Sequence, residues 1–375
     1  MNLNNLNKIN IIKKNYYLKL FFILYLCLFL IVIKYENSLY NFIIGNKKRN
    51  IGIIGYTNDN NIGNQLLKYS MDALLKRFGF NSTLISIKTK KNIHINFLKK
   101  YLNIKEIKNF YTDIKKNDYD FIIVDSDQVW SYCFKYILEV GFLSFAKNWD
   151  IKKIVYGASL GYEHWNVSRK IINSAQKLIK QFSGVSVREE QSIETINKFL
   201  GIRPQFVLDP TFLLEKDDYL KIVRDFKTNL NINKDYLCVY ILDKSTTKSN
   251  YINRVSKLLN YSVIDIKVRG KNFIEKFIYS INISKSVITD SFHGTVFSII
   301  FNKPFLTFIN KKRGKIRFDS LGKIFNIENR FIYPKKFEMS ELNNFIMNPA
   351  INISNFNNLK EKSLDFLKNY LEISK

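Results

Sequence analysis

A histidine stands at the junction of an expected strand and an expected helix. His293 lies in the stretch TDSFHGTVFSIIFNKPF, which begins at Thr289, and Ser291 and Gly294 flank it. The ordinary pKa of histidine is close to neutral, so an imidazole at this corner can give or take a proton during a reaction. We therefore predict a catalytic acid or base at His293, with Ser291 and Gly294 in contact with substrate. The alternative is a buried histidine with a structural role.

An arginine follows another expected strand. Arg188 stands in the stretch SVREE, directly ahead of an expected helix. A guanidinium group binds a carboxylate or a phosphate through two parallel hydrogen bonds. We predict that Arg188 is catalytic and holds an anionic part of the substrate. The alternative is an ion pair with Glu189 or Glu190.

Polar residues also end several other expected strands. Because the carboxyl ends of parallel strands meet at one edge of a sheet, side chains there converge on a ligand. The glycine in the loop before the first helix lets backbone amides approach an anion. The predicted substrate-binding residues at these strand ends are Gly63, Asn64, Ser126, Asp127, Gln128, Ser159 and Asp209. For Ser126 and Asp127, capping of the next helix is an equal alternative.

Strands and helices alternate after residue 50, which predicts an α/β fold with parallel sheets and right-handed crossovers. A stretch rich in lysine and asparagine, near residues 215–233, separates two such halves. We predict two Rossmann-like domains facing a cleft, one over residues 47–215 and one over residues 234–335, and a helical tail over residues 336–375. Ligands of such folds bind in the cleft between the domains.

The N-terminal segment, residues 1–46, is hydrophobic. An unbroken apolar run extends from Leu20 to Ile33, and lysines flank it on both sides. A membrane span needs about 20 apolar residues, and residues 16–33 approach that length. We predict an uncleaved anchor that holds the protein at the cytoplasmic face of the cell membrane. The alternative is a buried helix packed on the globular part.

Charge and cysteine content narrow the possible partners. The net charge is +27, but the lysines are scattered, and no zinc-finger or RNA-binding pattern accompanies them. We therefore expect no nucleic-acid partner, and we attribute the charge mainly to codon bias, with a contribution from anionic substrates. The three cysteines form no CxxC pair, and the patterns GxxxxGK[ST] and GxGxxG are absent. We expect neither a metal centre nor a bound cofactor.

Six stretches together resemble one family. In chain order they are IGNQLLKYSMDALLKRFGF, FIIVDSDQVW, VYGASLG, VSVREEQSI, VLDPTFLL and the stretch around His293. Over residues 50–332 this ordered set closely resembles the polysaccharide pyruvyl transferases. The resemblance implies the two-domain fold of B-type glycosyltransferases and transfer of a pyruvyl group from phosphoenolpyruvate onto sugar hydroxyls as a ketal. It also implies that His293 acts as the acid or base and that Arg188 holds the donor.

Two positions depart from the family pattern. Some members carry an arginine just before the histidine, where this chain has Ser291 and Phe292. Other cations must then help to hold the donor, and the candidates, in falling order of expectation, are Arg188, Lys244, Arg269 and Arg317. In the stretch that reads GSDQ in many members, Asp125 replaces the glycine.

Two other functions fit the same sequence. A glycosyltransferase with a nucleotide-sugar donor would use the same two-domain scaffold, because a fold alone does not determine chemistry. A membrane-tethered relative that binds glycans without catalysis would also retain the strand-end residues. Release of phosphate or of nucleotide from the respective donor separates these possibilities.

Overall fold

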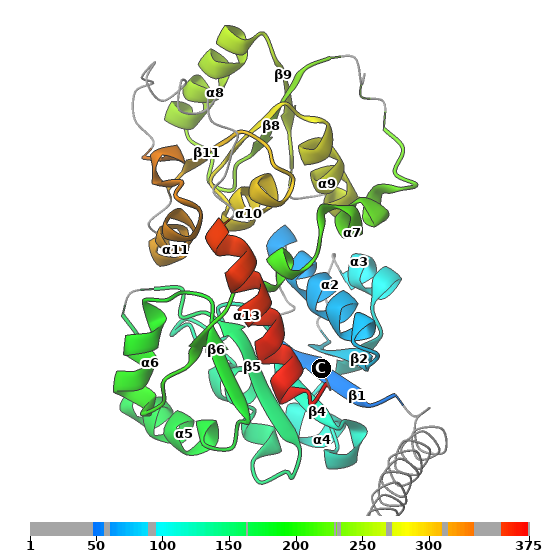
Figure 1. Ribbon diagram of the computed structural model, residues 1–375, viewed down its shortest axis with the longest axis vertical. Coiled ribbons are helices and arrows are strands. Elements are labelled where there is room, and N and C mark those ends of the chain that lie inside the picture. The colour runs from blue at the N-terminus through cyan, green and yellow to red at the C-terminus, as the bar shows by residue number, and fades with distance from the viewer. Residues whose placement is uncertain are drawn as a thin grey trace, which may run out of the picture. The chain divides into compact units, whose positions relative to one another are not determined.

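The computed structural model describes residues 48–55, 61–88, 95–162, 164–228, 230, 234–267, 272–309, 314–333 and 354–373. Two parallel sheets, each covered by helices, organise this part of the chain (Figure 1).

The first half begins with β1 (Asn50–Ile54), α2 (Ile62–Arg77), β2 (Asn81–Ile87), α3 (Ile95–Tyr101), β3 (Ile104–Ile107), α4 (Phe110–Asp113) and β4 (Phe121–Val124). It continues with β5 (Lys152–Ala158), α5 (Arg169–Ile179), β6 (Gly184–Val187), α6 (Ser192–Leu200), β7 (Gln205–Phe206), the 3-10 helix η4 (Pro210–Leu213) and α7 (Lys216–Leu220). The second half contains β8 (Tyr236–Tyr240), α8 (Thr246–Leu259), β9 (Ser262–Asp265), α9 (Phe273–Ile283), β10 (Ser286–Thr289), α10 (Phe292–Ile300), β11 (Phe305–Phe308), α11 (Lys315–Phe325) and β12 (Phe331–Ile332). The last described helix is α13 (Ser354–Tyr370).

Strand order creates one switch point in each sheet. The seven-stranded sheet runs β3-β2-β1-β4-β5-β6-β7, and the five-stranded sheet runs β12-β11-β10-β8-β9. All of these pairings are parallel. The chain order reverses between β1 and β4 in one sheet and between β8 and β10 in the other. Loops that leave neighbouring strands on either side of such a point diverge and open a crevice for a ligand.

The central strands are apolar along their whole length because helices cover both faces of a parallel sheet. All residues of β4, with sequence FIIV, and of β10, with sequence SVIT, are buried. Turn chemistry then starts the helices that follow. The Asn61 side chain accepts a hydrogen bond from the Gly63 amide at 2.9 Å and caps α2, and Ser291 caps α10 in the same way.

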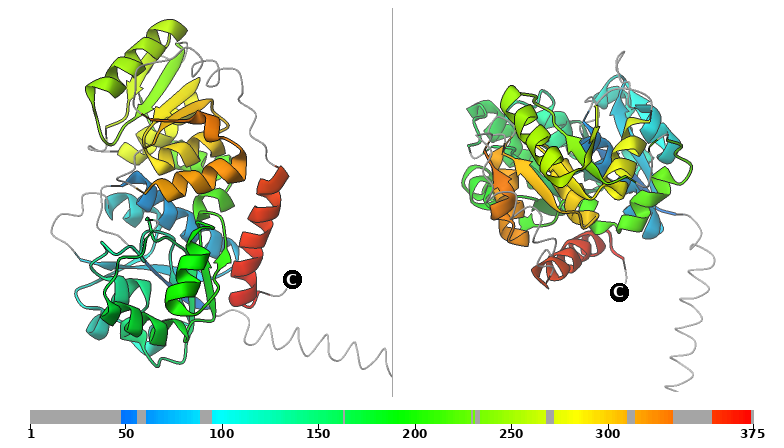
Figure 2. Two further views of the ribbon diagram at one scale, coloured as in Figure 1. Left: turned by 90° about the vertical axis from the view of Figure 1, so that its left-hand side faces the viewer. Right: turned by 90° about the horizontal axis from the view of Figure 1, so that it is seen from above.

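The two halves share a continuous apolar core. Tyr219 of α7 hydrogen-bonds Ser70 of α2 at 2.8 Å, and its ring packs on Phe297 of α10 with 4.8 Å between centroids. The helix α13, in the predicted tail, packs along the first half (Figures 1 and 2). There the Ser363 hydroxyl accepts from the Leu208 amide at 2.9 Å. Helices α2 and α10 are therefore packed together, and both begin at the edge where the switch points open.

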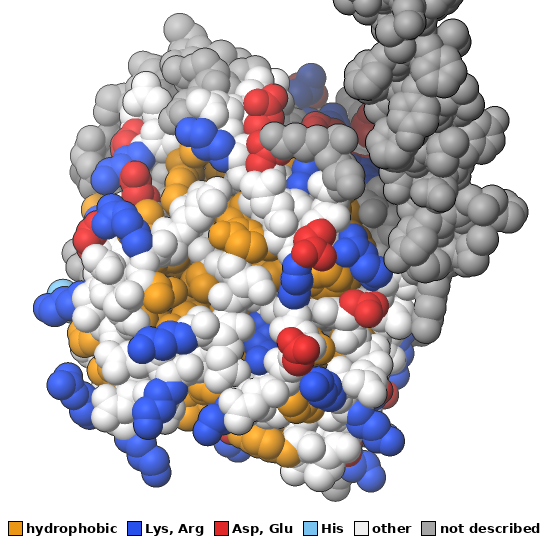
Figure 3. Space-filling model, turned by 60° about the horizontal axis from the view of Figure 1, so that its bottom comes forward, with side chains coloured by type: hydrophobic (Ala, Val, Ile, Leu, Met, Phe, Trp, Pro, Cys, Tyr) orange, Lys and Arg blue, Asp and Glu red, His pale blue; other side chains and the backbone are white. Residues whose placement is uncertain are grey.

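The expected N-terminal helix and membrane anchor over residues 16–33 lie outside the described residues. Among the helices that are described, none combines the length and the hydropathy needed to cross a membrane. On the face shown in Figure 3, lysine and arginine side chains are spread among acidic, apolar and uncharged ones and do not gather in one patch.

Candidate active site

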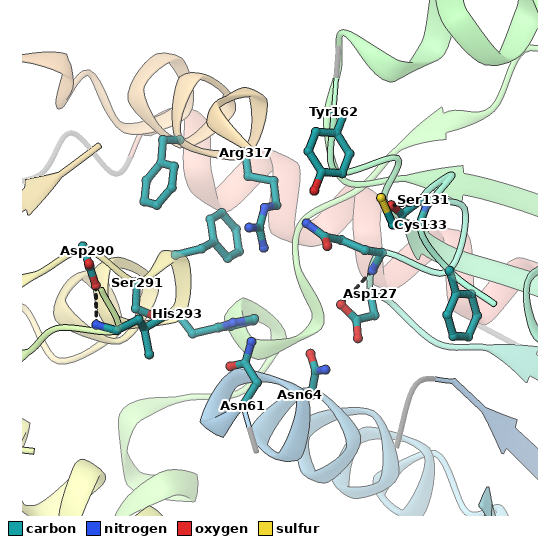
Figure 4. Close-up of a pocket in the computed structure, with 15 residues that line it drawn as sticks. Asn61, Asn64, Asp127, Ser131, Cys133, Tyr162, Asp290, Ser291, His293 and Arg317 are labelled. Carbon is teal, nitrogen blue, oxygen red and sulfur yellow. Dashed lines mark hydrogen bonds between the residues drawn. The ribbon is translucent and has the colours of Figure 1, made fainter. Parts of the chain in front are cut away.

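A cavity of about 360 Å³ lies where the two switch points face each other. The first half contributes Asn61, Asn64, Asp127, Gln128, Ser131, Cys133, Phe134 and Tyr162 to its lining. The second half contributes Leu242, Asp290, Ser291, Phe292, His293, Arg317 and Phe318. Figure 4 shows His293 and Arg317 extending from the second half towards Asn61, Asn64 and Asp127 of the first. The cavity is thus built by both halves and lined mainly with polar groups.

His293 reaches this cavity because α10 starts directly after β10. The Ser291 hydroxyl accepts the Gly294 amide at 3.3 Å and fixes the first turn of the helix. The imidazole is 3% exposed, and its Nε2 lies 3.7 Å from Oδ2 of Asp209. Burial lowers the pKa of His293, and the Asp209 carboxylate acts in the opposite direction. The ring is therefore neutral near pH 7, with a carboxylate behind it that stabilises the protonated form when a proton arrives.

Asp209 is held by several donors at once. Its Oδ2 accepts from Nη1 of Arg188 at 2.8 Å, and its Oδ1 accepts from the Thr211 amide at 3.1 Å and the Thr211 hydroxyl at 2.6 Å. Burial alone would raise the pKa of Asp209, but His293 and Arg188 outweigh burial and keep that pKa below its usual range. The carboxylate remains ionised and keeps the imidazole oriented.

Arg188 occupies a different place from the one expected for a donor-binding cation. Its guanidinium is buried and contacts Asp209, Glu189 at 3.3 Å and the Ser126 hydroxyl at 3.2 Å. It does not line the cavity. The expected alternative, an ion pair with Glu189, is present together with the stronger contact to Asp209. Two of its three nitrogens therefore hold carboxylates, while Nη2 has no hydrogen-bond partner among the described residues and lies 4.0 Å from Oδ1 of Asp127 in the cavity lining. Arg188 holds Asp209 in place, and its contact with a donor stays a prediction.

Arg317, ranked last among the candidate cations, lies in the cavity lining. Phe292 separates it from Arg188: the two guanidinium carbons lie 5.1 Å and 5.4 Å from the centre of the Phe292 ring. Burial and the charge of Arg188 lower the pKa of Arg317 to about 10, so it is still a cation at neutral pH. Lys244 lines a separate, smaller cavity and pairs with Asp265 at 2.7 Å. Arg269 lies outside the described residues.

The structure divides the other predicted substrate-binding residues into two groups. Asn64, Asp127, Gln128 and Ser291 line the cavity, and the backbones of Gly63 and Gly294 form the adjacent helix starts. Ser126 and Ser159 are buried behind the lining instead. The Ser126 hydroxyl donates to the Gly157 carbonyl at 2.8 Å, and the Ser159 hydroxyl accepts from the Gly161 amide at 3.0 Å. These two serines hold the loops that carry the lining residues.

Several lining residues were missed by sequence reasoning. Asp290 and Phe292 belong to the quoted stretch around His293, so their proximity was a usable signal. Asp290 accepts from the Leu242 amide at 2.6 Å and from Nζ of Lys248 at 2.6 Å, which ties the ends of β8 and β10 together. Cys133 and Tyr162 lie in irregular loops after β4 and β5, where no periodic pattern marks them.

Gly63 is needed because α2 begins against the imidazole. A Cβ atom at this position would stand 1.8 Å from Nδ1 of His293. We expect Gly63→Ala to lower the free energy of unfolding by about 1–3 kcal/mol, since neither backbone nor ring can move freely in a packed core. Activity should fall with it, because the ring is displaced. Urea unfolding measures the first effect, and an assay of the pyruvyl transfer that the sequence leads us to expect measures the second.

Gly79 provides a control at the far end of the same helix. No atom lies within 4 Å of its potential Cβ, although its φ of 87° makes alanine strained there. Gly79→Ala should therefore lose stability while keeping its activity. Equal activity losses in the two variants would contradict the proposed packing of Gly63 on His293.

Asp125, which replaces the glycine found in many family members, has a buried partner. Its Oδ2 lies 3.2 Å from Nζ of Lys68, and both side chains are fully buried. Oδ1 accepts the Ser126 amide at 2.8 Å, which orients the loop that leads to Asp127. Burial raises the pKa of Asp125, and Lys68 opposes that rise.

Removing only one partner of this pair should be costly. Lys68→Met leaves a buried carboxylate without its cation, and we expect the free energy of unfolding to fall by about 3–5 kcal/mol. The double variant with Asp125→Gly removes both charges and should regain most of that loss. A double variant no more stable than Lys68→Met, measured in urea, would show that the two residues are not coupled.

The two sheets and their shared crevice define the class of fold, which is that of B-type glycosyltransferases and sugar-nucleotide epimerases. The UDP-GlcNAc 2-epimerase of Methanocaldococcus jannaschii superposes with a TM-score of 0.60 at 13% identity, covering 87% of this chain and 100% of that one. The UDP-GlcNAc 2-epimerase of Neisseria meningitidis, solved with UDP-GlcNAc, gives a TM-score of 0.54 at 10% identity, with 87% and 100% covered. At these identities the likeness concerns the fold alone.

The family follows from the sequence. The polysaccharide pyruvyl transferase family model matches residues 61–312, and the chain belongs to that family. General stress protein 30 of Bacillus subtilis (strain 168) is 26% identical over 285 residues, which cover 71% of this chain and 75% of that protein. The expected fold and the expected family are both confirmed.

Proposed function

We propose that this protein transfers the pyruvyl group of phosphoenolpyruvate to two hydroxyls of a glycan sugar and forms a pyruvate ketal. Membership of the polysaccharide pyruvyl transferase family supports a transferase with a pyruvyl donor and a sugar acceptor. The observation that carries the specific proposal is the pairing of functions in one cavity. The neutral imidazole of His293, which has the buried Asp209 carboxylate behind it, lines the 360 Å³ cavity. The guanidinium of Arg317 lines the same cavity.

The donor is a dianion or trianion, so its site needs positive potential. Arg317 presents a fork of N–H donors that matches either the carboxylate or the phosphate. The N-termini of α2 and α10 also open at this cavity and add partial positive charge. We assign the donor anion to Arg317 of α11. This residue would replace the arginine that some family members carry just before the histidine and that this chain lacks.

The reaction forms two C–O bonds at C2 of the donor and breaks the bond between C2 and the phosphate oxygen. One sugar hydroxyl adds through oxygen to C2 of the enol phosphate, its proton leaves, and C3 receives a proton and becomes a methyl group. The oxygen of the second hydroxyl then bonds to C2 as the bond between C2 and the phosphate oxygen breaks. The proton of this hydroxyl passes to the departing phosphate, so the ketal closes and inorganic phosphate is released. His293 accepts the hydroxyl proton and can return it to the reactants, and Asp209 stabilises the imidazolium in between.

The acceptor hydroxyls need partners that bind neutral polar groups. Asn61 and Asn64 extend from the start of α2 into the cavity, and Asp127 faces them (Figure 4). Amide and carboxylate groups accept hydrogen bonds from sugar hydroxyls, and the amides also donate. We assign the acceptor sugar to this side of the cavity, opposite Arg317.

A donor assay tests the proposal. With phosphoenolpyruvate and a glycan acceptor we expect stoichiometric phosphate release together with a pyruvate mass increment on the glycan, measured by mass spectrometry. Release of nucleoside diphosphate from a nucleotide sugar, with no pyruvylated product, would instead support the glycosyltransferase alternative that the fold permits. Glycan binding without turnover of either donor would support the non-catalytic alternative. Phosphate release without acceptor modification would also contradict pyruvyl transfer.

A further inference from the structure

A second cavity, of about 540 Å³, adjoins the first. Tyr132, Tyr162, His164, Asn166, Gly314, Lys315 and Ile316 line it, and Tyr162 lines the first cavity as well. Its volume lies within the ~300–1,000 Å³ that small-molecule sites occupy. Nothing in the proposed transfer chemistry uses this second space, although it begins at the wall of the reaction cavity.

Two tyrosines form one side of the second cavity. The rings of Tyr132 and Tyr162 stand 4.9 Å apart at an angle of 47°, and Tyr132 is 41% exposed. Figure 4 shows the Tyr162 side chain pointing into the reaction cavity beside Arg317. An exposed aromatic face suits the apolar C–H face of a sugar ring, while the phenol hydroxyl can bond to the sugar's edge.

Polar groups stand around these rings. His164 and Asn166 follow Tyr162 along the loop, and Lys315 begins α11 on the other half. An amide, an imidazole and an ammonium group offer both donors and an acceptor to the hydroxyls of a sugar ring. An aromatic face beside hydrogen-bonding groups, one of them the Lys315 ammonium that also pairs with Asp319 at 2.7 Å, matches the apolar face and the hydroxyl edge of a sugar ring.

Contacts within the protein hold the walls of the second cavity. Nε1 of Trp165 donates to the Trp130 carbonyl at 2.6 Å and anchors the loop that carries His164 and Asn166. Across the cavity, a Cβ on Gly314 would stand 2.2 Å from the Gly161 carbonyl oxygen, so the two halves touch backbone to backbone there. Such fixed walls reduce the ordering that binding must impose.

We propose that the second cavity binds the sugar unit next to the reacting one, so that the protein prefers an oligomeric glycan acceptor to a single sugar. This inference rests on the proposed function, because it assigns the reacting sugar to the first cavity. Tyr162 forms the shared wall, and Tyr132 contacts only the neighbouring unit.

Binding to a length series tests this subsite. The probes are mono- and tetrasaccharides of β-linked glucose, galactose and N-acetylglucosamine, with affinities measured by titration of the full chain. We expect a tetrasaccharide to bind more tightly than its monosaccharide. Tyr132→Ala should weaken tetrasaccharide binding roughly tenfold and leave monosaccharide binding unchanged. Tyr111→Ala is the matched control, because Tyr111 is 57% exposed and lines neither cavity.

The outcomes separate the subsite from the chemistry. Binding requires no turnover, so the length preference should persist in Arg317→Gln even though transfer is strongly slowed. A wrong donor assignment would leave the length preference intact, and a wrong subsite would leave transfer to a single sugar intact. Equal affinity for short and long probes, equal effects of Tyr132→Ala and Tyr111→Ala, or no binding of any probe would overturn the proposal.

Discussion

Replacing His293 with glutamine is expected to lower kcat for pyruvyl transfer by about 10²–10⁴-fold. Glutamine keeps much of the volume of the ring and can still hydrogen-bond Asp209, but it cannot accept the hydroxyl proton. The fold should remain, because the apolar side of α10 and the Ser291 cap are unchanged. Steady-state kinetics and thermal unfolding of the same preparation measure both quantities.

Ser298→Ala in the same helix provides the control for this variant. The Ser298 hydroxyl donates to the Gly294 carbonyl at 2.8 Å, is buried, and does not line the cavity. We expect Ser298→Ala to keep wild-type kcat. If His293→Gln retained activity within about tenfold of wild type, the proton-transfer role would be excluded.

The pH dependence of His293 follows from the direction of its pKa shift. Burial lowers the pKa of the folded-state imidazole from its ordinary value of 6.5, so the neutral, proton-accepting form persists below that pH. The rate should hold as pH falls through 6.5 and decline only at lower pH. Between 6.5 and the folded-state pKa, the unfolded chain binds the proton first, so stability decreases with acidification. His293→Gln should lack this part of the stability loss.

Replacing Arg317 with glutamine should reduce kcat/KM for phosphoenolpyruvate by about 10²–10³-fold. The change removes the guanidinium that lines the first cavity and keeps a polar side chain of intermediate length. The stacking of Phe292 against Arg188 remains, so α10 keeps its position. Arg317→Lys retains the charge without the planar fork and should recover part of the rate. Isothermal titration with phosphoenolpyruvate separates lost binding from lost turnover.

Arg203→Gln is the matched control for the loss of an arginine. Arg203 pairs with Glu194 at 2.7 Å, and both side chains are about two-thirds exposed. Exposed pairs of this kind contribute little to stability, and neither residue lines the cavity. If Arg317→Gln bound phosphoenolpyruvate as tightly as wild type, the donor anion would have to be assigned to another group. If Arg203→Gln reduced kcat/KM for phosphoenolpyruvate equally, the effect of Arg317→Gln would be due to overall charge.

The fold was predictable because its signals are local and repeated. Buried strands such as FIIV and SVIT alternate with helices of clear apolar spacing, and strand–helix–strand repeats close in only one hand. The site was partly predictable for the same reason, since strand ends must meet at one edge. His293, Asp127 and Asn64 were found in this way.

The cations could not be ranked in that way. Arg188 stands ahead of an expected helix and Arg317 lies after the last expected strand, and neither position shows in the sequence which groups surround the side chain in the fold. In the folded chain, Asp209 and Glu189 surround Arg188, while Phe292 separates it from Arg317. Pairing with buried carboxylates follows from contacts between distant segments, which local patterns do not encode.

By itself, the sequence determined the α/β class, the family and the strand ends that carry polar groups, because periodicity and ordered motifs are properties of neighbouring residues. Only the tertiary structure decided which arginine faces the cavity, which carboxylate stands behind His293, and that Tyr132 and Tyr162 form a second cavity beside the first. Charge pairing, burial and the shape of a cavity arise when segments far apart in the chain are brought into contact.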